Sequence, residues 1–128
     1  MKTLFNILAV SISIILLHSC TEEPLSYATA GVTISMTIID VSDTTALVRG
    51  EVINEGGAPV IEKGVCWSTE QFPVINDFKT IGGSGDGSFT SYLAGLTANT
   101  VYYVRAYAIY STGAGYGNTL MFKTLQKQ

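Results

Sequence analysis

The feature that most constrains this chain is an alternating run of β-branched and aromatic residues at positions 101–109, directly after a turn at 96–100. Successive side chains of a β-strand point to opposite sides, so the run predicts a long strand with two different faces. One face is predicted to be buried and carries Tyr102, Val104, Ala106 and Ala108, whereas the other carries Val101, Tyr103, Arg105, Tyr107 and Ile109.

The rest of the chain after residue 30 also has the pattern of strands separated by turns. No segment there has an amphipathic helical period with caps. About seven short strands in roughly 100 residues predict an all-β fold, an antiparallel seven-stranded sandwich of two sheets. Residues 69–87 have the least periodicity, and the glycine-rich stretch 82–87 is expected to be a flexible turn. Besides the central run, strands are predicted at residues 32–39, 45–53, 60–68, 78–81, 88–93 and 116–124.

The first twenty residues are of a different kind. An apolar run from Leu4 to Leu17 follows Lys2; it is short for a membrane-spanning helix and has the position of a secretory signal peptide. Leu17-His18-Ser19-Cys20 resembles the lipobox of bacterial lipoproteins, although His18 departs from the residue usual there. The resemblance implies a signal peptide at 1–19, an acylated Cys20 and a lipidated tether at 20–30. An ordinary signal peptide or an uncleaved anchor is the alternative.

The residues after the cysteine bear on location. Thr21-Glu22-Glu23-Pro24 resembles the export signal of Bacteroidota-type lipoproteins, and a solvated acidic linker is the alternative. The resemblance implies a protein of the cell envelope that is lipid-anchored to the outer membrane and exposed at the surface. The membrane would then be a partner through the lipid alone.

The central run also carries a resemblance to a domain family. The spacing from Leu96 to Ala106 resembles the start of the sixth strand of a fibronectin type III domain, where the tyrosine, here Tyr102, is buried and its hydroxyl bonds back to the preceding turn. Gly64-Val65-Cys66-Trp67-Ser68 and Gly115-Tyr116-Gly117 resemble the fibronectin type III-like repeats of Bacteroidota lipoproteins. The resemblance covers about residues 31–125 and implies a fibronectin type III or immunoglobulin-like sandwich.

One position departs from that family. Gly50 stands where the second strand would have a tryptophan, and Trp67 from the third strand is expected to fill the space. Together with Leu96 and Tyr102, Trp67 is predicted to be structural.

Composition excludes several classes of function. The only histidine is His18, inside the predicted signal peptide, so the mature chain would lack the base of a Ser-His-Asp triad and any histidine metal ligand. Cys66 lies in an apolar strand and is expected to be a buried small hydrophobe. The carboxylates are expected to be solvated charges rather than a glycosidase pair or a calcium site. We therefore expect no catalytic residue, no metal and no cofactor. A formal net charge of −3 with no basic run argues against nucleic acid.

The candidate contact residues are Tyr103, Arg105 and Tyr107, because rigid tyrosines with an interleaved arginine are typical of contact surfaces. Pairing with neighbours across the strands is the alternative. The loops that carry Tyr110 and Tyr116 are a second candidate. Asp43-Thr44-Thr45 resembles a periplasmic O-glycosylation motif, for which a chance match is the alternative.

These observations predict a non-catalytic module that binds proteins or polysaccharides, or serves in adhesion. The alternative is a structural spacer or accessory subunit docked on an envelope complex; a small hydrolase is disfavoured. A contiguous exposed aromatic patch would favour binding, whereas a face broken up by charged side chains would favour the spacer.

Overall fold

A computed structural model of the protein describes residues 32–127. The predicted signal peptide, Cys20 and the tether lie outside the described residues.

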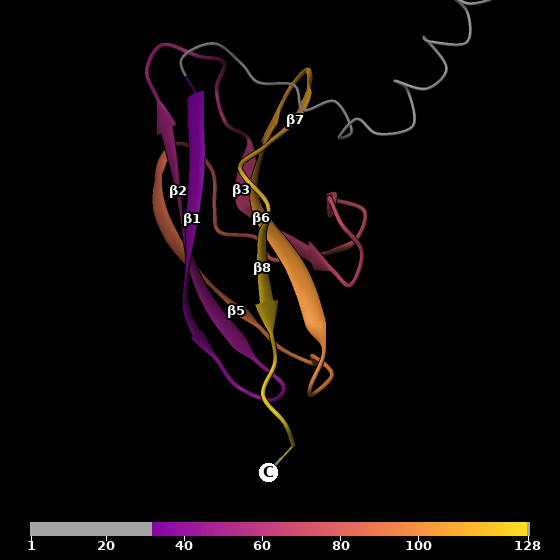
Figure 1. Cartoon of the computed structure of the whole chain (residues 1–128). Helices are drawn as coiled ribbons and strands as arrows, with labels where there is room; N and C mark the ends of the chain where they lie inside the picture. The colour runs from indigo at the N-terminus through magenta and orange to yellow at the C-terminus, as the bar shows by residue number, and fades with distance from the viewer. Residues whose placement is uncertain (1–31, 128) are drawn as a thin grey trace, which may run out of the picture.

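In this region the chain forms two antiparallel sheets that face each other (Figure 1) and contains no helix. One sheet has the order β1-β2-β5; the other has the order β4-β3-β6-β7, with β8 also paired to β6. The predicted all-β, two-sheet sandwich is confirmed. The strands are β1 (Val32–Val41), β2 (Ala46–Asn54), β3 (Glu62–Ser68), β4 (Phe78–Lys79), β5 (Gly87–Leu93), β6 (Val101–Tyr110), β7 (Gly113–Tyr116) and β8 (Leu120–Lys123).

The last predicted strand is divided into β7 and β8, which pair in turn with β6. The interruption lies at Gly117, whose N–H bonds the Ala106 carbonyl at 2.9 Å. A Cβ at Gly117 would lie 2.7 Å from the carbonyl oxygen of Ile34. The break therefore allows the strand to approach β1 closely, and only glycine fits there.

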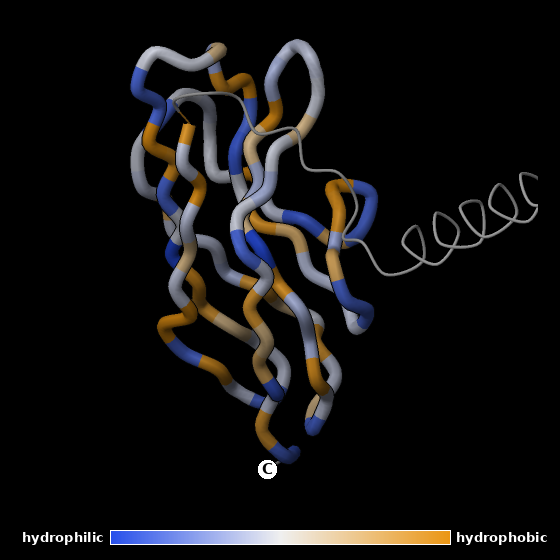
Figure 2. The backbone as a smooth tube through the Cα atoms, turned by 45° about the horizontal axis from the view of Figure 1, so that its top comes forward, coloured by the Kyte–Doolittle hydropathy of each residue, from blue (hydrophilic) through white to orange (hydrophobic). Residues whose placement is uncertain are grey.

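Strand alternation places the core between the sheets. Figure 2 shows hydrophobic and hydrophilic positions alternating along the strands. Burying this apolar surface is the main favourable contribution to the folding of such a sandwich. The most deeply buried residues of the core include Val48 and Val52 of β2, Val65 of β3, Leu93 of β5, and Val104, Ala106 and Ala108 of β6.

The space beside Gly50 is filled by Phe89, not by Trp67 as predicted. Gly50 and Phe89 are cross-strand partners of β2 and β5, and a Cβ at Gly50 would clash with the ring. Trp67 is buried in the core and stacks on Phe78, with ring centroids 5.9 Å apart.

The tyrosine near the start of β6 closes one end of the sandwich. The Tyr102 hydroxyl accepts a hydrogen bond from the Thr97 N–H at 2.8 Å, as the motif predicts. At the same end, the Leu96 N–H bonds the Thr44 carbonyl and the Leu125 N–H bonds the Ser42 carbonyl. The start of β6 therefore lies beside the end of β1, at the opposite end of the sandwich from Val32.

The glycine-rich stretch 82–87 is fastened to β3, whereas the sequence predicts a flexible turn. The buried Lys63 ammonium donates to the carbonyls of Ser84, Gly85 and Asp86 at 3.4, 3.2 and 2.9 Å. The Gly82 N–H also bonds the Lys63 carbonyl at 2.7 Å. Three carbonyls thus satisfy a cation that burial would otherwise disfavour.

Within residues 32–127 the structure has no helix of the length and hydropathy needed to cross a bilayer.

Candidate functional site

The predicted contact row lies beneath another segment of the chain. Tyr103, Arg105 and Tyr107 do share one face of β6, as the alternation predicts, but Arg105 and Tyr107 are only 1% and 0% exposed. For Arg105 the reason is the connection between β3 and β4: its Pro73 is buried, and the Pro73 carbonyl accepts a bond from Arg105 Nε at 2.6 Å. The Tyr107 ring lies against Lys79 of β4, whose Nζ is 5.6 Å from the ring centroid. The prediction that the three side chains form an exposed contact row is wrong for Arg105 and Tyr107, and Tyr103 is half-buried.

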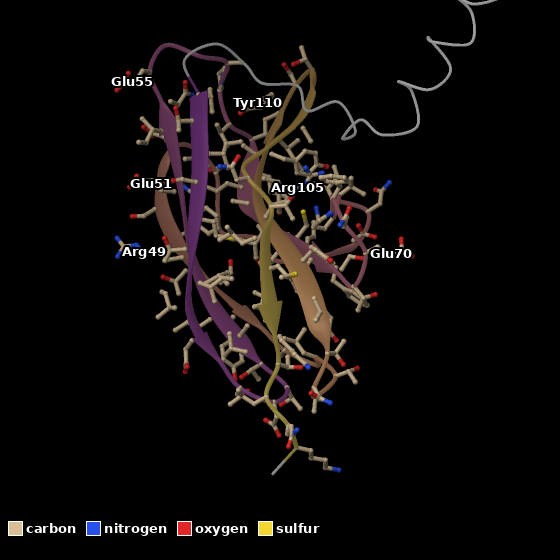
Figure 3. The ribbon with its side chains drawn as sticks, in the orientation of Figure 1. Arg49, Glu51, Glu55, Glu70, Arg105 and Tyr110 are labelled. Carbon is tan, nitrogen blue, oxygen red and sulfur yellow. The ribbon has the colours of Figure 1, made fainter. Side chains whose placement is uncertain are left out.

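Arg105 has a structural role, because it contacts two other segments of the chain. Its guanidinium stacks over the Tyr116 ring, 4.0 Å from the centroid, and the Tyr116 hydroxyl accepts a bond from the Ile75 N–H at 3.1 Å. Figure 3 shows Arg105 within the body of the molecule, whereas Arg49 and Glu51 project outwards from the other sheet. Arg105 therefore holds the β3–β4 connection against its own sheet.

The outer side of β6 that lies beneath the β3–β4 connection is called the covered face. Tyr107 lies in a polar cluster at its border. Its hydroxyl lies 2.7 Å from the Thr80 carbonyl and 2.9 Å from Glu62 Oε2, which also pairs with Lys79 at 2.8 Å. Burial, and then the neighbouring Glu62 carboxylate, raise the pKa of Tyr107. The bond from Lys79 is the main cause that lowers the pKa of Glu62. In this cluster the Tyr107 hydroxyl, the Glu62 carboxylate and the Lys79 ammonium are bonded to one another or to the Thr80 carbonyl, at the partly exposed edge of the sheet.

Cys66 is enclosed by the same connection. Its sulfur lies 3.5 Å from the Pro73 carbonyl and 3.7 Å from the Arg105 carbonyl. Burial raises the pKa of the thiol to about 12. Because the thiolate is the reactive form, Cys66 is an inert, buried side chain.

The second candidate, the loops that carry Tyr110 and Tyr116, stays a prediction, but the two tyrosines themselves lie within β6 and β7. Tyr110 is 3% exposed, and burial raises its pKa. Tyr116 lies against Arg105 and is half-buried. Neither tyrosine projects from a loop. Thr44 of the glycosylation motif is exposed in the β1–β2 turn, and its modification stays a prediction.

An open cleft of about 420 Å³ lies where β3 ends and β4 begins. Phe78 is the most exposed apolar side chain beside it, at 71%. The stack on Trp67 holds the Phe78 ring in place. The residues that line the cleft are Ser68, Thr69, Asn76, Asp77, Phe78 and Tyr102.

The polar side of this cleft is held by local hydrogen bonds. The Asp77 N–H bonds the Val74 carbonyl at 2.9 Å, and the Val74 N–H bonds Asp77 Oδ2 at 2.9 Å. Ser68 Oγ accepts a bond from the Glu70 N–H at 3.0 Å. Because Asp77 and Ser68 are already positioned, these two side chains lose less conformational entropy when a ligand binds. The combination of an exposed ring and fixed polar groups suits a small-molecule or ligand-end site.

Tyr103 lines a second groove, and it is not among the residues that line the cleft beside Phe78. The second groove has a volume of about 230 Å³ and lies between the β3–β4 connection and β8. It is lined by Gln71, Phe72, Tyr103, Thr119, Leu120 and Met121.

No protein-family model matches the chain, and no curated protein matches it. Solved structures do resemble it. The sixth fibronectin type III domain of human fibronectin type III domain containing protein 3 is 24% identical, with a TM-score of 0.56 over 82% of this chain and 93% of that one. A fibronectin type III domain of human collagen XX is 19% identical, with a TM-score of 0.51 over 81% and 99%. The fold is that of a fibronectin type III domain.

A bacterial structure also resembles this chain in its fold. The sensor domain of the anti-sigma factor RsgI4 of Pseudobacteroides cellulosolvens is 14% identical, with a TM-score of 0.56 over 78% of this chain and 100% of that one. At this identity the likeness concerns the fold alone.

The fibronectin type III-like fold has no metal centre in the part of the chain that the structure describes. No group of three or more His, Cys, Asp or Glu side chains there could hold a metal ion. The cleft beside Phe78 is the candidate site, because an exposed aromatic ring and positioned polar groups lie together there.

Proposed function

We propose that this protein is a surface-displayed bacterial lipoprotein whose fibronectin type III-like domain is a non-catalytic module for binding proteins or glycans. In this proposal residues 1–19 are a signal peptide, Cys20 carries the lipid, and 20–30 form the tether. The observation that supports binding is the exposed Phe78 ring beside fixed polar groups in a cleft.

The position of the cleft agrees with display. Tyr102 lies at the end of the sandwich opposite Val32, and a ten-residue strand such as β1 spans about 30 Å. A domain held through the residues before Val32 would therefore present the end that carries Tyr102, which is one border of the cleft, away from its attachment.

Binding is tested with the full chain in detergent, screened against matrix proteins and polysaccharides. We expect saturable binding that Phe78→Ala weakens at least ~10-fold, as for a central aromatic contact. Ile81→Ala is the matched control, because Ile81 is an exposed apolar residue of the same region but does not line the cleft. Thermal unfolding of each variant checks its folding. No saturable binding by folded protein would contradict the proposal.

The anchor is tested separately. Cells expressing the chain are fed labelled palmitate, and we expect the label and the membrane association to be lost in Cys20→Ser. Protease added to intact cells should remove the domain if it is surface-displayed. A label that survives in Cys20→Ser would contradict lipidation at this cysteine.

A structural spacer is the second candidate, because the outer face of the β1-β2-β5 sheet is broken up by charge. Arg49 and Glu51 are exposed there among serine and threonine side chains. The two functions differ in one result: a spacer has no soluble ligand, so Phe78→Ala would leave every interaction unchanged.

A further inference from the structure

We infer that the cleft beside Phe78 takes a neutral saccharide, an inference that rests on the proposed binding function and names its ligand class. Three properties of the cleft carry it: a fixed aromatic platform, a surround of polar side chains, and the sign of its charge.

The platform is the Phe78 ring. It is 71% exposed, yet its orientation is set by the stack on Trp67, with 5.9 Å between centroids and 21° between the planes. The apolar C–H face of a pyranose packs against such a ring, as other apolar faces do. Since the ring is already positioned, little side-chain freedom remains to be lost on binding.

The polar surround matches the edge of a sugar. The Asn76 amide both donates and accepts, the Asp77 carboxylate accepts, and the hydroxyls of Ser68 and Thr69 do both. Five of the six lining residues carry a polar side-chain atom, and Phe78 is the exception. A ligand for this cleft therefore needs an apolar face for the Phe78 ring and hydrogen-bonding groups along one edge, and a saccharide provides both.

The charge of the cleft selects among saccharides. Among the described residues that line the cleft, Asp77 is the only charged one, and none is a lysine or arginine that could pair with an anion. The nearest lysine along the chain, Lys79, is paired with Glu62. Sulfated, phosphorylated and uronic acid sugars would meet a carboxylate with no compensating cation. A neutral saccharide avoids this repulsion.

The test uses Trp67, the only tryptophan of the chain, as a reporter in contact with Phe78. The full chain, in a detergent without a sugar headgroup, is titrated with maltohexaose, cellohexaose, xylohexaose and mannohexaose while tryptophan emission is followed. Heparin and polygalacturonate are the charged comparisons. We expect a saturable shift with at least one neutral oligosaccharide and none with the charged ones.

Variants locate the site. Phe78→Ala and Asn76→Ala should each weaken the binding at least ~10-fold, which is the loss of a good contact. Ile81→Ala should leave it unchanged. Because Phe78→Ala also alters the surroundings of the reporter, binding to this variant is measured by calorimetry, and thermal unfolding checks that it folds.

The outcomes separate the two proposals. If a protein ligand found in the screen depends on Phe78 while no neutral oligosaccharide binds, the binding module stands and the saccharide inference is wrong. Equal binding of heparin, or saccharide binding that survives both Phe78→Ala and Asn76→Ala, would also overturn the inference. If nothing binds the folded chain, both proposals fail together.

Discussion

The two sheets of this sandwich present outer faces that have the same strand pattern and opposite surroundings. Arg49 on β2 and Arg105 on β6 both occupy outward positions of strands that are paired on both sides. Arg49 is exposed to solvent, whereas Arg105 is 1% exposed beneath the β3–β4 connection. Alternation along a strand thus assigns a side chain to a face, but it does not say whether solvent or another segment lies over that face.

The covered face is stabilised by polar contacts as well as by packing. Arg105 joins Pro73 to the Tyr116 ring, and Tyr107 bonds the Thr80 carbonyl. On the open face, Arg49 and Tyr92 are exposed at the corresponding outward positions. Substitutions made in pairs, one on each face, should therefore have unequal effects on stability.

The largest difference is expected between the two arginines. Arg105→Ala leaves a cavity and leaves the Pro73 carbonyl with only the weakly donating Cys66 thiol, so we expect the free energy of unfolding to fall by about 2–4 kcal/mol. Arg49→Ala should change it by less than about 0.5 kcal/mol. Urea unfolding measures both, and equal effects would show that the β3–β4 connection contributes little to stability.

The tyrosines form the next pair. Tyr107→Phe removes the hydroxyl that bonds the Thr80 carbonyl and Glu62, and we expect a loss of about 1–2 kcal/mol in the free energy of unfolding. Tyr92→Phe removes a hydroxyl from a side chain that is 62% exposed, and should cost almost nothing. The pair is compared by the same urea titration; a cost for Tyr107→Phe no larger than for Tyr92→Phe would argue against the buried cluster.

Alkaline pH should weaken the covered face. Burial raises the pKa of Cys66 from 9.0 to about 12, so the unfolded chain loses this proton before the folded chain does. The stabilisation is present below about pH 9 and is lost as the pH rises towards about 12, by at most about 1.4 kcal/mol per pH unit. Tyr107, whose pKa burial also raises, acts in the same direction.

Cys66→Ala isolates this contribution. The stability advantage of the unsubstituted protein over Cys66→Ala should shrink by about 1 kcal/mol between pH 9 and pH 10 in urea unfolding. Parallel curves for the two proteins over this interval would contradict the burial of a protonated thiol.

The smallest effect is expected at the border of the covered face. Glu62 is partly exposed, and its pKa is lowered chiefly by the bond from Lys79. Its stabilisation is therefore present above the unfolded pKa of 4.5 and is lost as the pH falls below it. Glu62→Gln should cost about 0.5 kcal/mol at pH 7 and nothing near pH 3, whereas Glu51→Gln on the open face should cost nothing at either pH.

The sequence predicts those parts of the fold that depend on local pattern. The two faces of β6 and the bond from Thr97 to Tyr102 follow from alternation and from one turn motif. The covering of Arg105 does not follow, because it depends on contact with Pro73, which is 32 positions away in a segment without periodicity. Whether an outward arginine is buried is decided by such distant contacts.

Two other features do not follow from the local sequence pattern, for related reasons. They are the residue that fills the space beside Gly50 and the cleft beside Phe78. The partner of Gly50 is set by the register between β2 and β5, and Phe89 was available as the inward aromatic residue of β5. The signal for the cleft was Phe78, an aromatic residue directly after Asn76 and Asp77 in a short edge strand. Phe78 is exposed because β4, within residues 32–127, is an edge strand that pairs only with the last part of β3. Local sequence pattern does not predict such a pairing.

The placement of β1 at the edge of its sheet has a mechanical consequence. Among the described residues its ladder joins it to β2 alone, and the chain enters it at Val32, whereas Tyr102 of the cleft lies near the start of β6, towards the other end of the sandwich. If the chain is pulled at Val32 while a ligand holds the cleft, the force acts along β1. The hydrogen bonds between β1 and β2 lie perpendicular to this force. The force would be shared by the whole β1–β2 ladder in shear, instead of opening it one bond at a time.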